Sequence, residues 1–243
     1  MRYKITFSYD GTNFNGYQVQ PKLRTVQECL EQAVSFLNKQ TYTSVTSAGR
    51  TDKGVHAMAH VAHFDLSINN SLEKIKRGLN SNLPEDIHVI DVEKVSDDFH
   101  ARYCAKKKEY IYKINLGEYN PIDRNYVYQY NKELDIEAMS KAIKYFEGKH
   151  DFTSFVSSED DRVDKVRTIY KTNIKRNKDL LEISFIGNGF MKYQVRNMVG
   201  LLISIGEHKK EITDVEKIID NKNRSQKFKT AAACGLYLKK VWY

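Results

Sequence analysis

Apolar and polar positions alternate at the start of the chain and then change to a helical period. Residues 3–9 place an apolar or aromatic side chain at every second position, and this period of two predicts a strand. From Thr25 to Leu37 the apolar positions follow one helical stripe, and Thr25 with Glu28 has the spacing of a capping box. The pattern therefore predicts a strand followed by an amphipathic helix that begins at Thr25.

The same two periods predict the remaining elements. Further helices are expected near 72–79, from Asp135 to Gly148, over about 190–205 and after Thr213, with Asp135 and Thr213 as caps. Strands are expected at 42–46 and 58–64, after Pro84, and in the segments KKKEYIYKINL, RTIYKTNIKR, LLEISFIG and GLYLKKVWY.

Strands and helices thus interleave in two similar halves with a boundary near Ala105. This order predicts an α+β fold of two similar subdomains, 1–105 and 106–243, each a largely antiparallel sheet with helices on one face. A cleft between the two subdomains is the expected active site.

The charge balance favours a polyanionic partner. Lys and Arg number 39 against 31 Asp and Glu, a net charge of +8, and basic residues gather at 106–108, 162–178 and 222–229. Each phosphate that such a surface neutralises releases a counterion, although a single cluster is also typical of a solvated surface. Sixteen Tyr against one Trp add rings that can stack on bases or pack half-exposed on a sheet.

The three cysteines, Cys29, Cys104 and Cys234, are far apart and odd in number, which argues against a disulfide framework and a zinc site. No apolar run approaches the ~20 residues of a membrane span, and the first residues lack the apolar core of a signal peptide. We therefore expect a cytoplasmic protein without a membrane segment.

The segment SAGRTDKGVHA, residues 47–57, is the strongest candidate for chemistry. It lies between two predicted strands and places Asp52 between Arg50 and Lys53, with a glycine on either side. Asp near glycine commonly forms a plain Asx turn. The alternative is a carboxylate that Arg50 keeps ionised and that acts as a nucleophile on a negatively charged substrate.

Two other chemistries fit the segment less well. A glycosidase needs a second carboxylate, and no acidic residue lies close to Asp52 in sequence. His56, His60 and His63 recur nearby, but His60 and His63 differ in parity and so face opposite sides of a strand. We therefore predict no metal at this loop.

The segment GRTDKGVHA closely resembles the catalytic loop of the tRNA pseudouridine synthases of the TruA family, whose usual form is GRTDAGVHA. The resemblance extends over essentially the whole chain. Six more segments of the chain resemble the family and occur in the family's order. They are YDGTNFNGYQVQ, RTVQECLEQAV, FHARYCAKKKEYIYKI, GKHDFTSF, GNGFMKYQVRNMVG and AAACGLYLKKVWY.

The resemblance implies a role for each matching residue. Asp52 falls on the catalytic nucleophile, Tyr110 on the active-site tyrosine and Arg196 on the active-site arginine. Arg50 falls on the arginine that helps displace and hold the target nucleotide. Leu236 falls on an apolar residue that packs the site.

The same positions also have plain structural explanations. Tyr110 is a strand aromatic that suits a core, and Leu236 suits one equally. Arg196 suits a solvated helix face, although Gly200 one turn later is expected to leave its flank open to a phosphate or carboxylate. Two positions depart from the family: Tyr17 replaces a common Trp, and Lys53, where Ala is usual, is expected to strengthen phosphate contact.

The implied reaction converts uridine to pseudouridine in the anticodon arm of tRNA, at positions 38, 39 and 40. The C1′–N1 bond breaks, the base turns and C5 joins C1′, so no cofactor is expected. Asp52 would attack C1′ or the base, or abstract a ribose proton, while Arg196 pairs with it and Tyr110 stacks on the uracil. The family also implies a homodimer. An RNA-binding module without catalysis and an unrelated Asp-dependent hydrolase are the alternatives.

Overall fold

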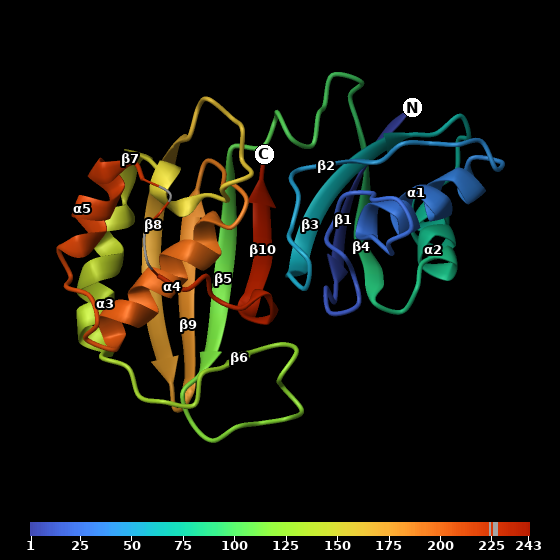
Figure 1. The fold of residues 1–243 in the computed structure, drawn as a ribbon. Coiled ribbons are helices and arrows are strands. Elements are labelled where there is room, and N and C mark those ends of the chain that lie inside the picture. The colour runs from blue at the N-terminus through green and yellow to red at the C-terminus, as the bar shows by residue number, and fades with distance from the viewer. Residues whose placement is uncertain (224, 226–227) are drawn as a thin grey trace. The chain divides into compact units, whose positions relative to one another are not determined.

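The computed structural model describes residues 1–223, 225 and 228–243 (Figure 1). By its contacts the chain divides into two compact units. The first contains Met1–Lys106 and Tyr237–Tyr243, and the second contains Lys107–Leu236. Within the described residues, no helix is both long and apolar enough to cross a membrane.

The first unit is built on a sheet with the strand order β4-β1-β3-β10. The central strand β1 pairs antiparallel with β3 and β4, and the short β2 also pairs with β3. Both helices, α1 and α2, lie on one face of this sheet (Figure 1). The bounds are β1 Arg2–Tyr9, α1 Val26–Leu37, β2 Thr46–Ser47, β3 His56–Asp65, α2 Leu72–Asn82, β4 Ile87–Val95 and β10 Leu236–Trp242.

The second unit has the strand order β5-β9-β8-β7, all antiparallel, with β6 added parallel to β5. The helices α3, α4 and α5 lie on one face of this sheet (Figure 1). The bounds are β5 Lys107–Asn115, β6 Tyr128–Gln129, α3 Ile136–Ala142, β7 Gly148–Asp151, β8 Val166–Asn177, β9 Leu180–Gly187, α4 Gln194–Gly206 and α5 Asp214–Asn221. Short 3-10 turns cover Ile143–Phe146, Thr153–Phe155 and Ala233–Gly235.

The two units confirm the α+β fold of two similar subdomains, each a mostly antiparallel sheet with helices on one face. In β1 the side chains of Tyr3, Ile5, Phe7 and Tyr9 are buried, as the alternation predicted. Core aromatics of the second unit, such as Phe185, are fully buried in the same way. The cores therefore follow the hydrophobic pattern of the chain.

The last strand of the chain packs with the first unit. Tyr237 lies opposite His56 in a parallel pairing of β10 with β3, and their rings stack with centroids 4.7 Å apart. The Tyr243 hydroxyl donates to the Ala101 carbonyl at 2.7 Å. The subdomain predicted from sequence as 106–243 includes this strand, whereas by contacts residues 237–243 group with the first unit.

Helix caps follow the sequence in part. Asp135 caps α3, because its side chain accepts from the Ala138 N–H at 2.9 Å. The helix α1 begins after Thr25 as predicted, but no capping box forms: the buried Thr25 hydroxyl has no hydrogen-bond partner among the described residues. At α5 the N-cap residue is Thr213, as predicted, but its side chain makes no capping hydrogen bond to the helix.

Several element boundaries differ from the prediction. The helix expected from Asp135 to Gly148 ends at Ala142 and continues as a 3-10 turn to Phe146. The helix expected over 190–205 begins at Gln194, because Tyr193 has a φ of 65° and a residue in this left-handed region ends a right-handed helix. The strand expected at 42–46 is reduced to Thr46–Ser47.

Candidate active site

The loop between β2 and β3 presents its three charged side chains differently. Arg50 and Lys53 are exposed, whereas Asp52 is half-buried. The Val55 N–H donates to the Asp52 carbonyl at 3.1 Å, and Gly54 has a φ of 76°, a conformation that glycine adopts without strain. Asp52 therefore lies at a tight turn that limits how its backbone can move.

The start of this loop is held at Gly49. The Gly49 carbonyl accepts a hydrogen bond from the Ser47 hydroxyl at 2.7 Å and lies 3.0 Å from Nε2 of His60, on β3. The preceding residue, Ala48, donates its N–H to the Val61 carbonyl at 2.8 Å. The loop therefore leaves the sheet at a fixed point.

The middle of the loop is held at Thr51, next to Asp52. The Thr51 hydroxyl and the Tyr9 hydroxyl are 2.8 Å apart and buried, so one donates to the other. The Thr51 carbonyl accepts from the Tyr17 N–H at 3.1 Å. Both sides of Thr51 are thus bound to residues from the first strand and the segment that follows it.

The segment YDGTNFNGYQVQ, at the end of β1, approaches the Asp52 loop closely at two glycines. A Cβ atom at Gly11 would lie 2.1 Å from the Val55 carbonyl oxygen, and one at Gly16 would lie 3.0 Å from the Thr51 carbonyl oxygen. The Gly11 N–H also donates to Nδ1 of His56 at 3.0 Å. The segments YDGTNFNGYQVQ and GRTDKGVHA therefore pack directly against each other. No periodicity connects the two segments, but the two glycines of the first segment mark where they come together.

The three histidines near Asp52 do not form a metal site. No group of three or more His, Cys, Asp or Glu side chains within the described residues is arranged to hold a metal ion. His60 packs against Phe7, whereas His63 accepts at Nδ1 from the Ala101 N–H at 3.1 Å. The opposite facing predicted for His60 and His63 fits these separate partners.

In the second unit, Tyr110 lies on β5 opposite Phe185. Its side chain is buried, with 8% of its surface exposed, and its ring meets the ring of Phe190 edge to face at 5.2 Å between centroids. The ring position is therefore fixed by packing.

Arg196 is in the first turn of α4 and is half-buried, so it is not a simple solvated arginine. Its Nε donates to the Ala231 carbonyl at 2.8 Å, and the Ala231 N–H donates back to the Arg196 carbonyl at 3.1 Å. Its guanidinium carbon lies 4.9 Å from the ring centroid of Tyr193, within the range of a cation–π contact. These contacts orient the guanidinium.

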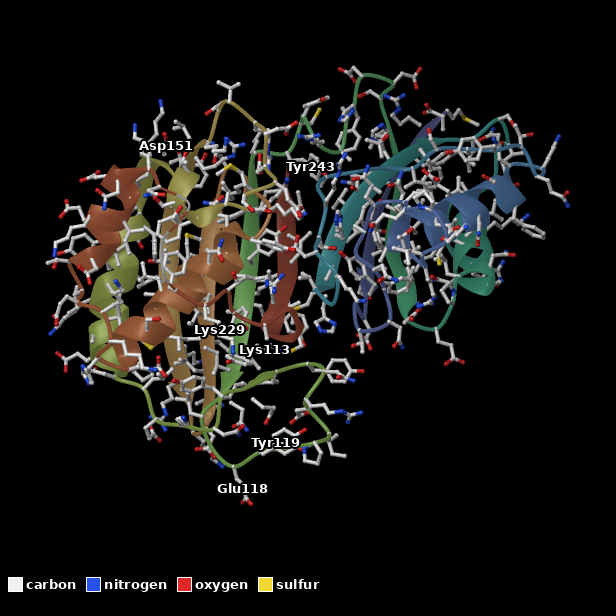
Figure 2. The ribbon with its side chains drawn as sticks, in the orientation of Figure 1. Lys113, Glu118, Tyr119, Asp151, Lys229 and Tyr243 are labelled. Carbon is white, nitrogen blue, oxygen red and sulfur yellow. The ribbon has the colours of Figure 1, made fainter. Side chains whose placement is uncertain are left out.

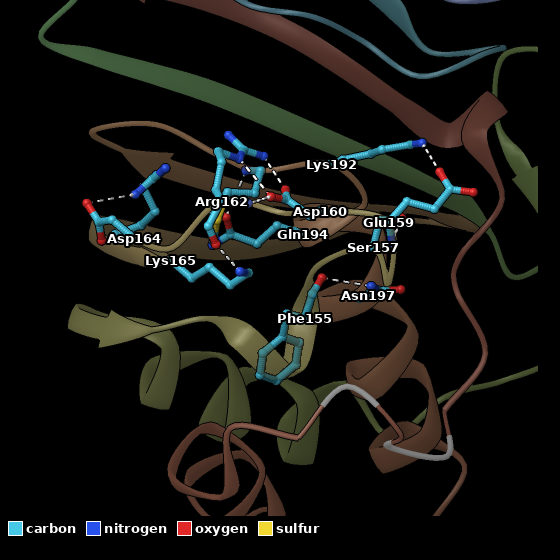
Figure 3. Close-up of polar contacts among 12 residues, drawn as sticks. Phe155, Ser157, Glu159, Asp160, Arg162, Asp164, Lys165, Lys192, Gln194 and Asn197 are labelled. Carbon is cyan, nitrogen blue, oxygen red and sulfur yellow. Dashed lines mark hydrogen bonds and ion pairs between the residues drawn. The ribbon is translucent and has the colours of Figure 1, made fainter.

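The expectation that Gly200 leaves an open flank beside Arg196 is wrong. A Cβ atom at Gly200 would lie 1.9 Å from the Lys229 carbonyl oxygen, so a backbone segment already fills this side of the helix. One turn earlier, Asn197 accepts from the Thr230 hydroxyl at 2.7 Å. Asn197 also donates to the Phe155 carbonyl at 2.7 Å (Figure 3). The segment 229–231 is therefore docked along α4.

The same segment continues to Leu236, which is 5% exposed. The Tyr112 hydroxyl donates to the Ala232 carbonyl at 2.7 Å, and burial raises the pKa of Tyr112 well above its usual value. A Cβ atom at Gly235 would lie 2.6 Å from the Lys113 carbonyl oxygen. Leu236 is therefore placed by close contact between its own segment and β5. This long-range approach had no signal in the local sequence pattern.

The basic cluster over 162–178 is partly neutralised within the chain (Figure 3). Arg162 forms an ion pair with Asp160 that lowers the pKa of this carboxyl to about 2. Lys165 is buried and donates to the Arg162 carbonyl, and Arg176 pairs with Glu133 at 2.8 Å. The cluster over 222–229 lies partly outside the described residues.

The tyrosines divide between core and surface. Tyr3 and Tyr112 are fully buried, whereas Tyr103 and Tyr119 are 76% and 55% exposed. Figure 2 shows Tyr119 on the loop that connects β5 to β6. Although exposed, the ring of Tyr103 already packs against the ring of His100, with centroids 4.3 Å apart.

Comparison with known proteins assigns a family. A family model described as "tRNA pseudouridine synthase" matches residues 5–104 and 142–243. The chain is 46% identical over 243 residues to "tRNA pseudouridine synthase A" of Geobacillus sp. (strain WCH70), covering 100% of this chain and 98% of that protein. Proteins of the same name from Ligilactobacillus salivarius (strain UCC118) and Streptococcus mutans serotype c are 45% and 44% identical, over 100% of this chain and 96% and 99% of theirs.

Proposed function

Because the chain belongs to the tRNA pseudouridine synthase family, we propose that it is the isomerase that converts uridine to pseudouridine in the anticodon arm of tRNA. The observation that carries this function is the match to "tRNA pseudouridine synthase A" proteins over the full chain. The reaction breaks C1′–N1 and forms C5–C1′ within one nucleotide, so it is balanced without a co-reactant.

Asp52 is the proposed nucleophile. Its carboxylate attacks C1′ or the base, or removes a ribose proton, and each of these steps needs the ionised form in a fixed place. The bonds at Gly49, Thr51 and Val55 support this role, because they restrain the backbone on both sides of Asp52. A restrained nucleophile loses less entropy when it reaches the reacting atom.

Tyr110 and Arg196 are the proposed partners of Asp52. The ring of Tyr110 stacks on the uracil, and its hydroxyl assists proton movement from C5. Arg196 holds the carboxylate charged and oriented, for which its own fixed guanidinium is suited. Arginine forms the planar, two-pronged contact that lysine cannot make.

Arg50, Lys53 and Leu236 are the proposed substrate contacts. The exposed Arg50 and Lys53 flank Asp52 and can reach a phosphate or a displaced nucleotide, and the buried Leu236 packs the site. The target nucleotide must leave its stack, which costs a few kcal/mol and is easiest in a loop or at a stem end. An anticodon arm satisfies this condition.

The net charge of +8 supports tRNA binding through many phosphate contacts. We further propose a homodimer that meets each tRNA with both subunits, acting in the cytoplasm. Neither a metal nor an organic cofactor takes part in the proposed reaction.

The test is pseudouridine formation by the purified protein on tRNA labelled with tritium at uridine C5. Asp52→Asn is expected to release no detectable tritium, while its affinity for tRNA, measured by filter binding, stays within about threefold because phosphate contacts dominate binding. Asp91→Asn, at an exposed carboxylate on β4, is the matched control and is expected to retain the parent rate. A parent protein that binds tRNA but releases no tritium would instead support a binding module.

A further inference from the structure

His60 is a fully buried histidine at the centre of β3, with none of its surface exposed. Its ring is stacked between Phe7, with centroids 5.2 Å apart, and Tyr17, with centroids 5.1 Å apart. A ring held on both faces cannot turn without repacking the core. The direction in which its nitrogen atoms point is therefore fixed.

The partners of the two ring nitrogens determine where the proton lies. Nε2 is 3.0 Å from the Gly49 carbonyl, and because a carbonyl oxygen only accepts, Nε2 must carry the hydrogen. Nδ1 lies 2.8 Å from the Val61 nitrogen and 3.1 Å from the Val61 carbonyl oxygen. Because the Val61 N–H points at Nδ1, a hydrogen on Nδ1 would meet it head-on, so Nδ1 accepts this bond. His60 therefore carries its hydrogen on Nε2 and donates to Gly49 of the Asp52 loop.

The Gly49 carbonyl has two donors, His60 and Ser47, and they differ in how freely they can move. The Ser47 hydroxyl, which also donates to Gly49, is on a half-exposed residue and its bond can rotate toward water. The imidazole of His60 has no such freedom. Gly49 is three residues from Asp52, so a shift of its carbonyl is passed directly to the carboxylate along a short, restrained loop.

We propose that His60 is a positioning residue of the reaction: its imidazole N–H holds the Gly49 carbonyl and thereby sets the position of the Asp52 carboxylate. This inference rests on the proposed function. His60 touches no reacting atom, so its effect is on the rate of the chemical step and not on tRNA affinity. Misplacement of a reacting group by about 1 Å can cost roughly a hundredfold in rate.

Two nearly isosteric substitutions test the donor separately from the volume. In His60→Gln the side-chain amide can still donate to Gly49, whereas in His60→Met it cannot. We expect the single-turnover rate at saturating tRNA to fall about 10- to 100-fold in His60→Met and less than about fivefold in His60→Gln. The Kd for tRNA is expected to stay within about twofold of the parent in both.

His63→Met is the matched control, because His63 is also buried and lies on the same strand, but contacts Ala101 and not the Asp52 loop. It is expected to lower the melting temperature while the rate per folded molecule stays within about twofold of the parent. His60→Asn, whose amide is too short to reach Gly49, gives a second variant without the donor and should be as slow as His60→Met.

Equal rates for His60→Gln and His60→Met, or a rate loss in His63→Met as large as that in His60→Met, would overturn the proposal. A rise in Kd with an unchanged single-turnover rate would also overturn it. These outcomes differ from failure of the proposed function, in which the parent protein itself forms no pseudouridine in the same assay.

Discussion

The loop that carries Asp52 and the segment that ends at Leu236 are both irregular stretches, but different atoms hold them in place. In the first unit, side chains of the sheet, Tyr9 and His60, hold the loop by hydrogen bonds. In the second unit, the backbone of the segment lies directly against Gly200 of α4 and is joined to Arg196. The first arrangement depends on single polar atoms, and the second depends on the absence of a side chain.

The largest expected effect on stability is in the second unit, where the backbone segment lies against Gly200. Gly200→Ala would place a Cβ atom 1.9 Å from the Lys229 carbonyl, so the segment must move away from α4. We expect a loss of about 3 kcal/mol in the free energy of unfolding, measured by urea denaturation, because overpacking a filled site typically costs 1–3 kcal/mol.

Gly189→Ala is the control for this substitution. A Cβ atom there would meet only the side chain of Arg167, at 3.9 Å, and the free energy of unfolding is expected to change by less than about 0.5 kcal/mol. Equal losses in the two variants would show that close approach at Gly200 is not what holds the segment.

A smaller effect on stability is expected in the first unit, where side chains hold the Asp52 loop. Tyr9→Phe removes one member of the buried hydroxyl pair with Thr51, and we expect a loss of about 1 kcal/mol in the free energy of unfolding. The single-turnover rate is expected to fall a few-fold, because Thr51 adjoins Asp52. Tyr3→Phe is the control. Among the described residues the Tyr3 hydroxyl reaches only the Met1 sulfur, at 4.0 Å, so its removal should leave both quantities nearly unchanged.

The last expected effect depends on pH and concerns the face of β3 that does not hold the loop. Burial, with Arg2 and His100 nearby, lowers the pKa of His63 to about 4. The unfolded chain, with an ordinary histidine pKa near 6.5, therefore binds more protons between these values, and stability falls as pH falls from about 6.5 to 4. The stability difference between the parent and His63→Gln should shrink over this range, as measured by urea denaturation at several pH values. A stability difference that stays constant with pH would contradict this expectation.

Local pattern predicted the parts of the molecule that depend on near neighbours. The alternation in residues 3–9 gave the buried face of β1, and Asp135 caps α3 because a cap bonds only three residues away. The position of Asp52 on a loop between strands could be predicted for the same reason.

Features set by distant segments were not predictable in this way. The flank of Gly200 was expected to be open because its filling comes from Lys229, 29 residues later. The start of α4 depends on the left-handed backbone of Tyr193, which no hydrophobic period indicates. The contact of Gly11 with Val55 likewise joins positions that no periodicity connects.

The parallel pairing of β10 with β3 also affects how the protein is made. A ribosome releases the chain from its N-terminus, so the first unit leaves the exit tunnel with one strand missing from its sheet. That strand is synthesised after the whole second unit. Domains generally fold in order of synthesis, and long-range pairings form slowly. The part of β3 at His56 and Ala57 that pairs with β10 therefore stays without this partner until the second unit has been synthesised, and only then can the sheet of the first unit be completed.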